Sequence, residues 1–447
     1  MLPMHMPGHK RNPSFAGDAF RSDITEINGF DDLHAPQGLI RDIEKNARKI
    51  WQAKEAFISV NGSTALIESA ICSLGDRGGK FLFSSDSHIS VWHGSEIAGL
   101  TPVPCPLKTS DGIPFFSGTN EDAAVSLLQN DPDIKLALIT TPTYEGVITD
   151  TSRIKKIMNE RGGFLIADCS HGAHLGLDPY FPERPDADIV IMSTHKTLHS
   201  PTQTAVAAVY SERIEIGRIR HFLSIFESSS PSYVLMGGIC RALLDIRRSG
   251  KSLFSSWTEG LKEARERLSG LTNLSLWDGG SFSDPSKLVI LTNGCINGGE
   301  LAQILRRQYR IEIEASFEDH IIAMTGIGDT PPTLLRFCDA MERIDGSLAV
   351  TSKKEIAAPF IITEPPVFML PLEDALSRES TAVSYKDAAG KISAEYIFPY
   401  PPGIPAIVPG QLITDSIVRY LIKSGSSGIR LRVDPLRDPD GMIKICR

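Results

Sequence analysis

The chain is 447 residues long, which exceeds one ordinary hydrophobic core and predicts two or three domains at roughly 150 residues each. Its 41% hydrophobic and 22% charged residues are typical of a globular protein, and its net charge of -8, without a dense basic block, argues against a nucleic-acid-binding surface. No apolar stretch approaches the roughly 20 residues that cross a bilayer, and residues 1–15 carry polar residues and prolines where a signal peptide needs an apolar core. We therefore expect a cytoplasmic protein, without a membrane or nucleic-acid partner, that acts on a small molecule.

Residues 1–45 are rich in proline, glycine and aspartate and lack a sustained periodicity, which predicts an extended N-terminal arm with a first helix near residues 38–53. Short, continuous apolar runs then alternate with helix-like segments such as ALIESAICSL and DTSRIKKIMNERG. This alternation predicts an α/β domain over residues 46–250 with a mainly parallel, doubly wound sheet. The expected strands are residues 56–60, 80–85, 135–141, 163–168, 188–193 and 204–211.

The pattern changes after residue 250. A long charged helix, WTEGLKEARERLSG, precedes the run SKLVILTN, the helix GGELAQILRRQY and the strand pair RIEIEAS and HIIAMTGI, which predicts a smaller α+β domain over residues 251–345. Residues 346–447 form either a third lobe or an extension of that domain. The seven cysteines are scattered and include no C-x-x-C pair, so we expect reduced thiols that fill buried apolar space.

Two residues at the ends of apolar runs carry the strongest chemical signal. Asp168 ends the run GGFLIAD, and Lys196 follows the run ADIVIMS directly after Ser193, Thr194 and His195. A lysine at the opening of a parallel sheet, accompanied by an aspartate from a neighbouring strand, suits a Schiff-base aldehyde cofactor with a protonated ring nitrogen, which is pyridoxal 5'-phosphate. The alternatives are a solvated loop lysine and a helix-capping aspartate.

The segment Asn61-Gly62-Ser63-Thr64 follows a predicted strand and opens a helix. Exposed N–H groups and the positive end of the helix dipole predict a phosphate-binding site there, with Ser63 and Thr64 as ligands. The alternative is an ordinary Ser/Thr helix cap.

His88 is a candidate to stack on the cofactor ring, or else a helix cap. Thr141-Pro142-Thr143-Tyr144 is expected to turn across the sheet opening, where ligands collect in α/β folds. Five other histidines could suggest a metal site, but the H-E-x-x-H pattern is absent, so we predict none. They are His5, His9, His171, His174 and His195.

These residues lie within a set of motifs that occurs in order along nearly the whole chain. The motifs are MPGHK (6–10), DDLHAPQG (31–38), VNGST (60–64), DSHISVWHG (86–94), TTPTYEGV (140–147), DCSHGAH (168–174), STHKTL (193–198), SSSPSY (228–233) and YPPGIP (400–405). The chain thereby resembles the ornithine/lysine/arginine decarboxylase family of fold type I pyridoxal-phosphate enzymes.

The resemblance implies a fold type I large domain with a mainly parallel, seven-stranded sheet and a smaller α+β C-terminal part. It makes Lys196 the Schiff-base lysine, Asp168 the partner of the pyridine nitrogen and His88 the ring-stacking group, with His171 near the ring face or oxygen of the cofactor. Ser63, Thr64, Ser193 and His195 become phosphate ligands. The resemblance also implies a homodimer in which the segment with Ser230 and Tyr233 reaches the active site of the second subunit.

The chain departs from the family pattern in two motifs. Cys169 and Ser170 stand where the family commonly has D-E-A-H-G-A-H, and Ile89 stands where it commonly has H-K-S. Both changes bear on substrate choice and cofactor packing. The sequence also starts almost at the PGHK motif, so we expect a short form without the N-terminal receiver-like domain.

The reaction implied is decarboxylation of arginine, lysine or ornithine to the corresponding amine. Transamination uses the same apparatus and is the closest alternative, and Arg430 or Arg432 could serve as the carboxylate-binding arginine that it needs. A catalytically silent binding protein of the same fold is a further alternative. The cationic end of a basic substrate requires a carboxylate, because burying an unpaired cation is costly, and the candidates are Asp31, Asp32 and Glu314.

Overall fold

The structure is a computed structural model that describes residues 2–5, 10, 12, 23–348, 362, 364–400, 403–426, 431–434 and 440–447. Part of two predicted motifs, residues 6–9 and 401–402, lies outside the described residues, as do His9 and Arg430. None of the helices in the described ranges carries an apolar stretch of the length that a bilayer crossing demands.

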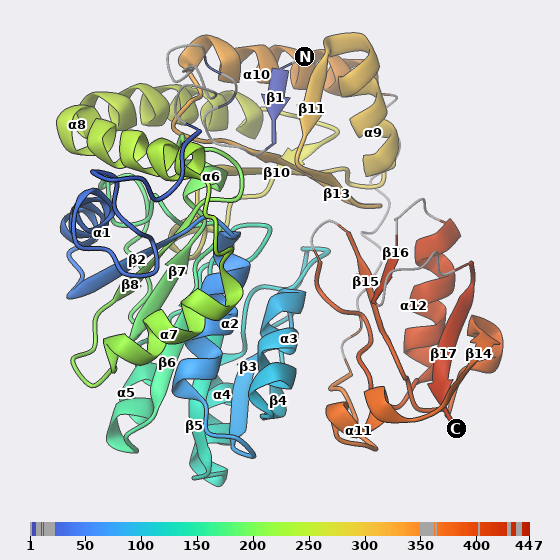
Figure 1. Cartoon of the computed structure of the whole chain (residues 1–447). Helices are drawn as coiled ribbons and strands as arrows, with labels where there is room; N and C mark the ends of the chain where they lie inside the picture. The colour runs from blue at the N-terminus through green and yellow to red at the C-terminus, as the bar shows by residue number, and fades with distance from the viewer. Residues whose placement is uncertain are drawn as a thin grey trace.

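A seven-stranded sheet forms the centre of the large domain, in the order β2-β8-β7-β6-β5-β3-β4 (Figure 1). All neighbouring pairs are parallel except those that β8 makes with β2 and β7, which confirms the expected α/β fold with a mainly parallel sheet. Its strands are β2 (Glu55–Ser59), β3 (Lys80–Ser84), β4 (Thr101–Cys105), β5 (Ile134–Thr140), β6 (Phe164–Asp168), β7 (Ile189–Met192) and β8 (Ala205–Val209).

Helices cover both faces of this sheet because successive strand residues point to opposite sides. Ala56 and Ile58 of β2 belong to the core beneath one helical layer, and Phe57 belongs to the core beneath the other. The first layer holds α1 (Leu39–Ile50), α4 (Glu121–Asn130), α5 (Ser152–Glu160) and part of α8 (Tyr233–Ser269). The second layer holds α2 (Gly62–Leu74), α3 (Ile89–Ala98) and α7 (Ile216–Phe226).

Strand β4 lies at the edge of the sheet and is absent from the strands that we expected from the sequence. Pro102 and Pro104 interrupt its apolar pattern, and a proline has no backbone N–H to donate to a neighbouring strand. An edge strand needs a partner on one side only, and β3 provides it here. Its position in the sheet therefore explains why the chain tolerates both prolines.

Helix α8 runs without interruption from the large domain into the small domain and is 37 residues long. Its C-terminal half packs on α10 (Pro331–Ser347) of the small domain. Trp257 and Leu261 belong to the same core as Phe337 and Met341. The domain boundary that we placed at residue 250 therefore falls inside one helix.

The small domain is built on a four-stranded antiparallel sheet in the order β12-β13-β10-β9. The buried lysine Lys10 joins the N-terminal segment to this domain, since its Nζ donates to the carbonyl oxygens of His5 and Met324 at 2.7 Å each. Strand β1 (Leu2–Met4) pairs in parallel with β11 (Ile311–Ile313) of the same domain. The other elements are β9 (Ser275–Leu276), η3 (Gly280–Phe282), β10 (Lys287–Leu291), α9 (Gly298–Ile304), the π turn η4 (Leu305–Tyr309), β12 (Ala315–Ser316) and β13 (His320–Met324).

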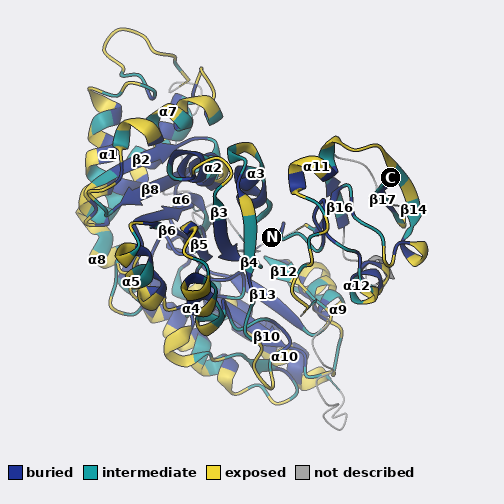
Figure 2. Ribbon diagram, turned by 90° about the horizontal axis from the view of Figure 1, so that it is seen from below, coloured by how far each residue is buried: buried dark blue, intermediate teal, exposed yellow. Residues whose placement is uncertain are grey.

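The C-terminal residues form a lobe with a core of its own, set beside the large domain (Figures 1 and 2). This lobe contains two separate two-stranded sheets, β14-β17 and β15-β16. His93 of α3 bonds to Asp434, and Tyr396 bonds to Glu96, across the contact with the large domain. The elements are α11 (Leu372–Ser377), β14 (Ser380–Ser384), η5 (Tyr385–Asp387), β15 (Tyr396–Pro399), α12 (Asp415–Ser426), β16 (Leu431–Asp434) and β17 (Met442–Cys446).

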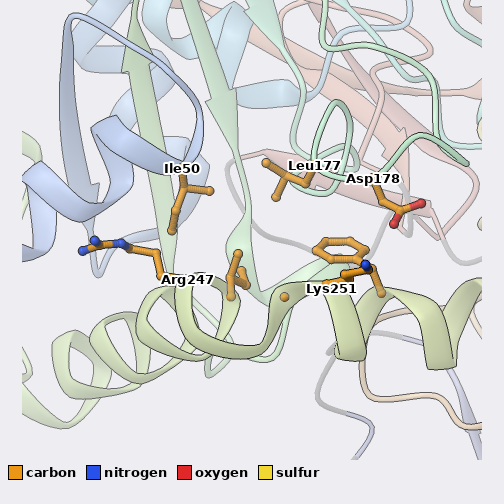
Figure 3. A pocket seen from close by; sticks show the side chains of 8 residues that line it. Ile50, Leu177, Asp178, Arg247 and Lys251 are labelled. Carbon is orange, nitrogen blue, oxygen red and sulfur yellow. The ribbon is translucent and has the colours of Figure 1, made fainter.

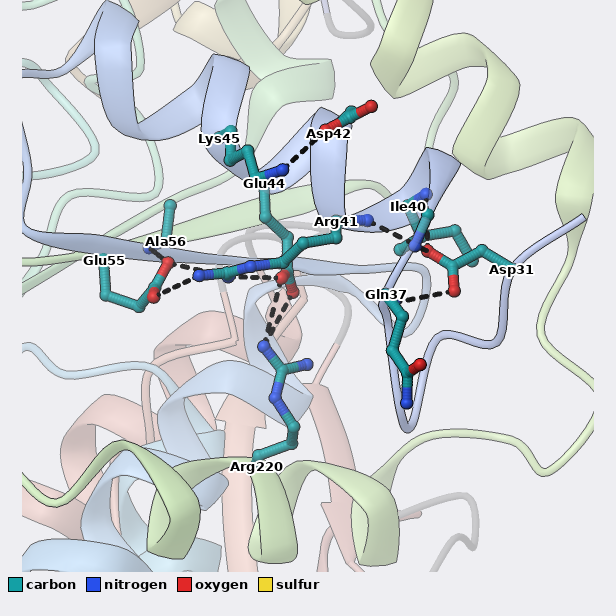
Figure 4. Close-up of polar contacts among 11 residues, drawn as sticks. Asp31, Gln37, Ile40, Arg41, Asp42, Glu44, Lys45, Glu55, Ala56 and Arg220 are labelled. Atoms are coloured by element: carbon teal, nitrogen blue, oxygen red, sulfur yellow. Dashed lines mark hydrogen bonds and ion pairs between the residues drawn. The ribbon is translucent and has the colours of Figure 1, made fainter.

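A buried carboxylate links three elements of the large domain (Figure 4). Glu44 of α1 is fully buried and accepts hydrogen bonds from Arg41 at 3.0 Å and from Arg220 of α7 at 3.1 Å. Arg41 also binds both oxygens of Glu55 on β2. Burial raises the pKa of Glu44, and the two arginines oppose that rise.

Removing Arg220 is expected to destabilise the large domain through Glu44. Arg220→Ala leaves the buried carboxylate with one cation and should lower the free energy of unfolding by about 1–3 kcal/mol near neutral pH. The loss should shrink as the pH falls toward the ordinary pKa of 4.5, because a protonated Glu44 needs no arginine.

Urea unfolding at two pH values measures this effect. Lys45→Ala is the matched control, since Lys45 belongs to an exposed ion pair with Asp42 and its removal should change stability by less than about 0.5 kcal/mol. An equal effect of the two variants would contradict the role assigned to Glu44.

Candidate active site

The parallel strands β5, β6 and β7 are neighbours in the sheet and end at the same edge. Asp168 is the last residue of β6 and is 4% exposed. Lys196 lies in the short helix α6 (Thr194–Thr197), directly after β7. The structure therefore brings the predicted pair to one edge. Burial lowers the pKa of Lys196, and the nearby Asp168 carboxylate opposes part of this decrease.

The Asp168 carboxylate takes its hydrogen bonds from Ser170. Its Oδ1 accepts from the Ser170 backbone N–H at 3.1 Å and from the Ser170 hydroxyl at 2.5 Å. Burial raises the pKa of Asp168, and Ser170 and Lys196 oppose that rise. Ser170 is one of the departures from the family pattern, so this departure adds a hydroxyl donor to the acid.

His171 is bonded on both ring nitrogens to lysines. Its Nε2 lies 3.0 Å from the Nζ of Lys196, and its Nδ1 lies 2.7 Å from the Nζ of Lys287. Tyr144, from the predicted turn after β5, meets the ring edge-on with centroids 5.3 Å apart. Burial and the two lysines hold the pKa of His171 well below its ordinary value, so the ring is neutral.

Lys287 was not among the site residues predicted from the sequence. It is the first residue of β10, a position at which a polar side chain usually faces solvent. In the structure, however, the residue is 1% exposed. The available signal was its position inside the buried run SKLVIL, where a lysine is rare unless its charge is paired.

Glu314 is the one of the three predicted substrate acids that lies within the site. Its Oε1 accepts a hydrogen bond from the Tyr144 hydroxyl at 3.0 Å, and its charge raises the pKa of Lys196 and of Lys287. Asp31 instead caps α1, since its Oδ2 accepts from the N–H groups of Gly38, Ile40 and Arg41.

Asp32 also serves the local backbone, because its Oδ1 accepts from the His34 N–H at 2.8 Å. Asp31 and Asp32 therefore act as turn and helix caps in this structure, the alternative role that short acids often take.

His88 lies at the N-terminus of α3, beside Lys196. Its Nδ1 accepts from the Ser90 N–H at 3.2 Å, so this histidine does cap the helix. Burial lowers the pKa of His88 to about 4, which keeps the ring uncharged. Gly403 of the C-terminal lobe packs against the ring, and a Cβ atom there would lie 3.1 Å from two ring atoms.

The predicted phosphate site lies where α2 begins. The hydroxyls of Ser63 and Ser193 are 2.7 Å apart, which joins the first turn of α2 to the end of β7. Asn61 makes no side-chain cap bond among the described residues and instead donates to the Phe226 carbonyl. Thr64 is exposed, and His195 Nδ1 bonds to the Thr204 carbonyl at 2.9 Å.

The segment at residues 228–233 packs on the N-terminal region of its own chain. The Tyr233 hydroxyl donates to the Asp31 carbonyl, and His34 bonds to the Ser228 carbonyl. Ser230 is exposed. The reach of Ser230 and Tyr233 toward a second subunit stays a prediction.

Two hollows lie away from Lys196 and Asp168. A cavity of about 250 Å³ lies between α8, the end of α1 and the turn at Leu177 and Asp178 (Figure 3). A surface hollow of about 410 Å³ is lined by Phe30, Asp31 and Leu39 with their neighbours. Neither contains Lys196 or Asp168 in its lining, so we place the active site at the sheet edge on the geometry of its side chains.

The donor set at this edge fits pyridoxal phosphate. A lysine amine can form the imine, a buried acid can face the ring nitrogen, and paired hydroxyls at a helix N-terminus can hold the phosphate. This combination on a mainly parallel sheet defines a fold type I pyridoxal-phosphate enzyme.

The chain belongs to the Orn/Lys/Arg decarboxylase family. Residues 3–279 match the major domain of that family, and residues 360–428 match its C-terminal domain. The protein is therefore a pyridoxal-phosphate-dependent amino-acid decarboxylase.

Similar proteins include arginine decarboxylases. The protein of Halalkalibacterium halodurans is 28% identical over 98% of this chain and 92% of its own length, and that of Bacillus subtilis is 26% identical over 98% and 92%. The protein YaaO of Bacillus subtilis is 30% identical over 93% and 90%.

Solved structures share the fold at lower identity. The Francisella novicida lysine decarboxylase LdcF superposes with a TM-score of 0.80 at 18% identity, over 97% of this chain and 76% of that one. An alanine–glyoxylate aminotransferase from Nostoc gives 0.61 at 15%, over 77% and 94%. Because the fold serves both reactions, family membership and not the fold indicates decarboxylation.

Lys196→Ala is expected to abolish the visible absorbance that pyridoxal phosphate develops when it forms an imine with the protein. The visible absorption spectrum of the purified variant after addition of the cofactor measures this. Lys287→Ala is the matched control, because it removes the other lysine bonded to His171 and should leave the band in spectra recorded at about pH 10. A band that persists in the Lys196 variant would identify a different imine-forming lysine.

Proposed function

We propose that the chain decarboxylates a basic L-amino acid, with L-arginine as the first substrate to test. The observation that carries the proposal is the position of Glu314 in the same buried cluster as Lys196, where a carboxylate can pair with the cationic end of a substrate. The arginine decarboxylases among the similar proteins support arginine over lysine and ornithine.

In this proposal, Lys196 holds the cofactor and Asp168 faces its ring nitrogen. Pyridoxal phosphate, when bound, supplies the electron sink for the carbon that loses CO2. Ser170 orients the Asp168 carboxylate through its short hydrogen bond. His88, kept neutral by burial, presents a flat uncharged ring, while Ser63, Thr64, Ser193 and His195 surround the phosphate.

Transamination is the reaction that competes most closely with decarboxylation. An aminotransferase fixes the α-carboxylate of its substrate with an arginine, and Arg432 is the described candidate. Its guanidinium stacks on the Tyr400 ring at 3.6 Å. A decarboxylase instead gains from a less favourable carboxylate environment, since loss of CO2 then relieves an unfavourable contact.

A direct assay separates the two reactions. The holoenzyme is incubated with arginine, lysine and ornithine side by side, and CO2, amine and keto acid are measured. We expect CO2 and amine, with arginine turned over fastest. Keto acid without CO2 would reject decarboxylation, and a faster reaction of lysine or ornithine would reject the arginine preference.

Glu314→Gln is expected to weaken substrate binding. Loss of the negative charge should raise KM for the basic substrate about tenfold or more, equivalent to about 1.4 kcal/mol, with a smaller change in kcat. Steady-state kinetics measure both constants.

Asp31→Ala is the matched acid control. Since Asp31 caps α1, its loss should lower stability by about 1 kcal/mol and leave KM unchanged. A raised KM in the Asp31 variant, with none in the Glu314 variant, would exchange the roles of the two acids.

We further propose a cytoplasmic homodimer that brings the Ser230 and Tyr233 segment to the partner's active site. Phe30 and Leu39 support a contact surface beside this segment, since they are 43% and 56% exposed and line the surface hollow described above. Large apolar side chains grouped on a surface are typical of protein interfaces.

Leu39→Asp is expected to shift the dimer toward monomer, because it places a charge in that surface. Light scattering over a range of protein concentrations measures the mass. Ile422→Asp, at an exposed site on α12 of the C-terminal lobe, is the control and should leave the mass unchanged. A dimer that resists Leu39→Asp would place the interface elsewhere.

A further inference from the structure

One imidazole connects lysines from the two domains. Lys287 belongs to β10 of the small domain and Lys196 to α6 of the large domain, and each Nζ lies within 3.0 Å of a different nitrogen of His171. Gly146 packs directly on the Lys287 side chain, since a Cβ there would lie 2.7 Å from Lys287 Cγ. The lysine is therefore held firmly against the ring.

The hydrogen bonds limit how many protons Lys196, His171 and Lys287 can carry together. A neutral imidazole has one N–H donor and one acceptor nitrogen, whereas an ammonium group can only donate. His171 is neutral, because burial and the two lysines lower its pKa. Two ammonium groups cannot both bond to a neutral ring, so one of the two lysines is an uncharged amine in the hydrogen-bonded arrangement of the structure.

The groups around Lys287 favour it as the uncharged one. Burial lowers the pKa of Lys287 to about 8, with further lowering by Lys196 and Lys10. Asp284 and Glu314 oppose this effect, and Glu145 and Tyr144 also face the lysine from the loop after β5. Lys196 in turn has Asp168 beside it, which favours its charged form.

We propose that Lys287 accepts, through His171, the proton that Lys196 loses before its amine attacks an aldehyde. An N–H bond of Lys196 breaks as Nε2–H forms on His171, and Nδ1–H breaks as a new N–H bond forms on Lys287. No electrons are gained or lost. The ring changes tautomer and ends by donating from Nε2 to a neutral Lys196.

This inference rests on the role of Lys196 in the proposed function, and it makes Lys287 a positioning residue that acts through His171. Lys287 is therefore distinct from a structural lysine that only fills the space beside Gly146. The distinction is visible in the pH dependence of Lys196 reactivity and in the tautomer of His171.

The first experiment measures the reactivity of Lys196 in the full-length apoprotein. Pyridoxal phosphate is added, the imine is trapped with borohydride, and the modified peptide is quantified by mass spectrometry from about pH 6 to about pH 10. In the wild type, modification of Lys196 should rise with a midpoint near the Lys287 pKa of about 8.

Two variants at residue 287 separate the relay from a structural role. Lys287→Met keeps the shape but removes the proton acceptor, so modification between about pH 8 and about pH 9 should fall about tenfold and recover at higher pH. Lys287→Arg keeps a permanent cation that donates to Nδ1 of His171 and cannot accept a proton. Its modification should also lose the rise near pH 8, although the contact with His171 is kept.

Equal losses at every pH in Lys287→Met, or a rise near pH 8 that persists in either variant, would overturn the proposal. The second experiment is ¹⁵N NMR of histidine-labelled apoprotein, with His171 assigned from the signals missing in His171→Gln. The ring should carry its proton on Nδ1 in the wild type at about pH 9, above the Lys287 pKa, and on Nε2 in Lys287→Arg.

The NMR measurement also covers the case in which a variant fails to fold. If His171 of the wild type titrates near the ordinary histidine pKa of 6.5, the two lysines do not hold its ring and the proposal is wrong. Failure of the proposed function is distinguishable, because wild-type Lys196 would then take up no pyridoxal phosphate at any pH, whatever the state of His171.

Discussion

The shared edge of three neighbouring parallel strands is the constraint on which the rest of the site depends. Strands β5, β6 and β7 end together, so Asp168 and the α6 turn with Lys196 lie side by side without any long-range loop to bring them there. The residues of these strands are buried up to, or close to, the ends of the strands, so the sheet edge is also largely buried. Charged groups at that edge are therefore poorly hydrated, and the pKa of each responds strongly to its neighbours.

The small domain contributes further charged residues to the active site. Lys287 enters from β10 and Glu314 follows β11, so both act on Lys196 from outside the large domain. Opposite charges alternate across this region, with Asp168 and Glu314 against Lys196 and Lys287. Such alternation lets the protein bury several ionisable groups at moderate cost, since each charge has a partner of opposite sign nearby.

Much of the large domain could be predicted from the sequence, because its strands are short, apolar and separated by helical segments. Asp168 and Lys196 could be paired for the same reason. Strand β4 was missed because two prolines disguise an edge strand. The boundary placed at residue 250 falls inside α8, whose residues on both sides of that position belong to one continuous core.

The remaining differences concern contacts between segments distant in sequence. Lys287 and His171 are 116 positions apart, and Tyr144 and Glu314 are 170 apart, so no local pattern joins them. Asp31 and Asp32 attracted attention as acids near a motif, but local backbone N–H groups use their oxygens. Of the three predicted substrate acids, only Glu314 thus lies near Lys196 and Lys287 among the described residues.

Helix α8 also has a mechanical consequence. At about 1.5 Å per residue, its 37 residues extend for about 55 Å as a single helix that packs on both the large and the small domain. Bending such a rod breaks backbone hydrogen bonds, so the small domain cannot easily swing away from the sheet edge. A stiff helix that packs on both domains therefore limits how far Lys287 of the small domain can move from Lys196 of the large domain.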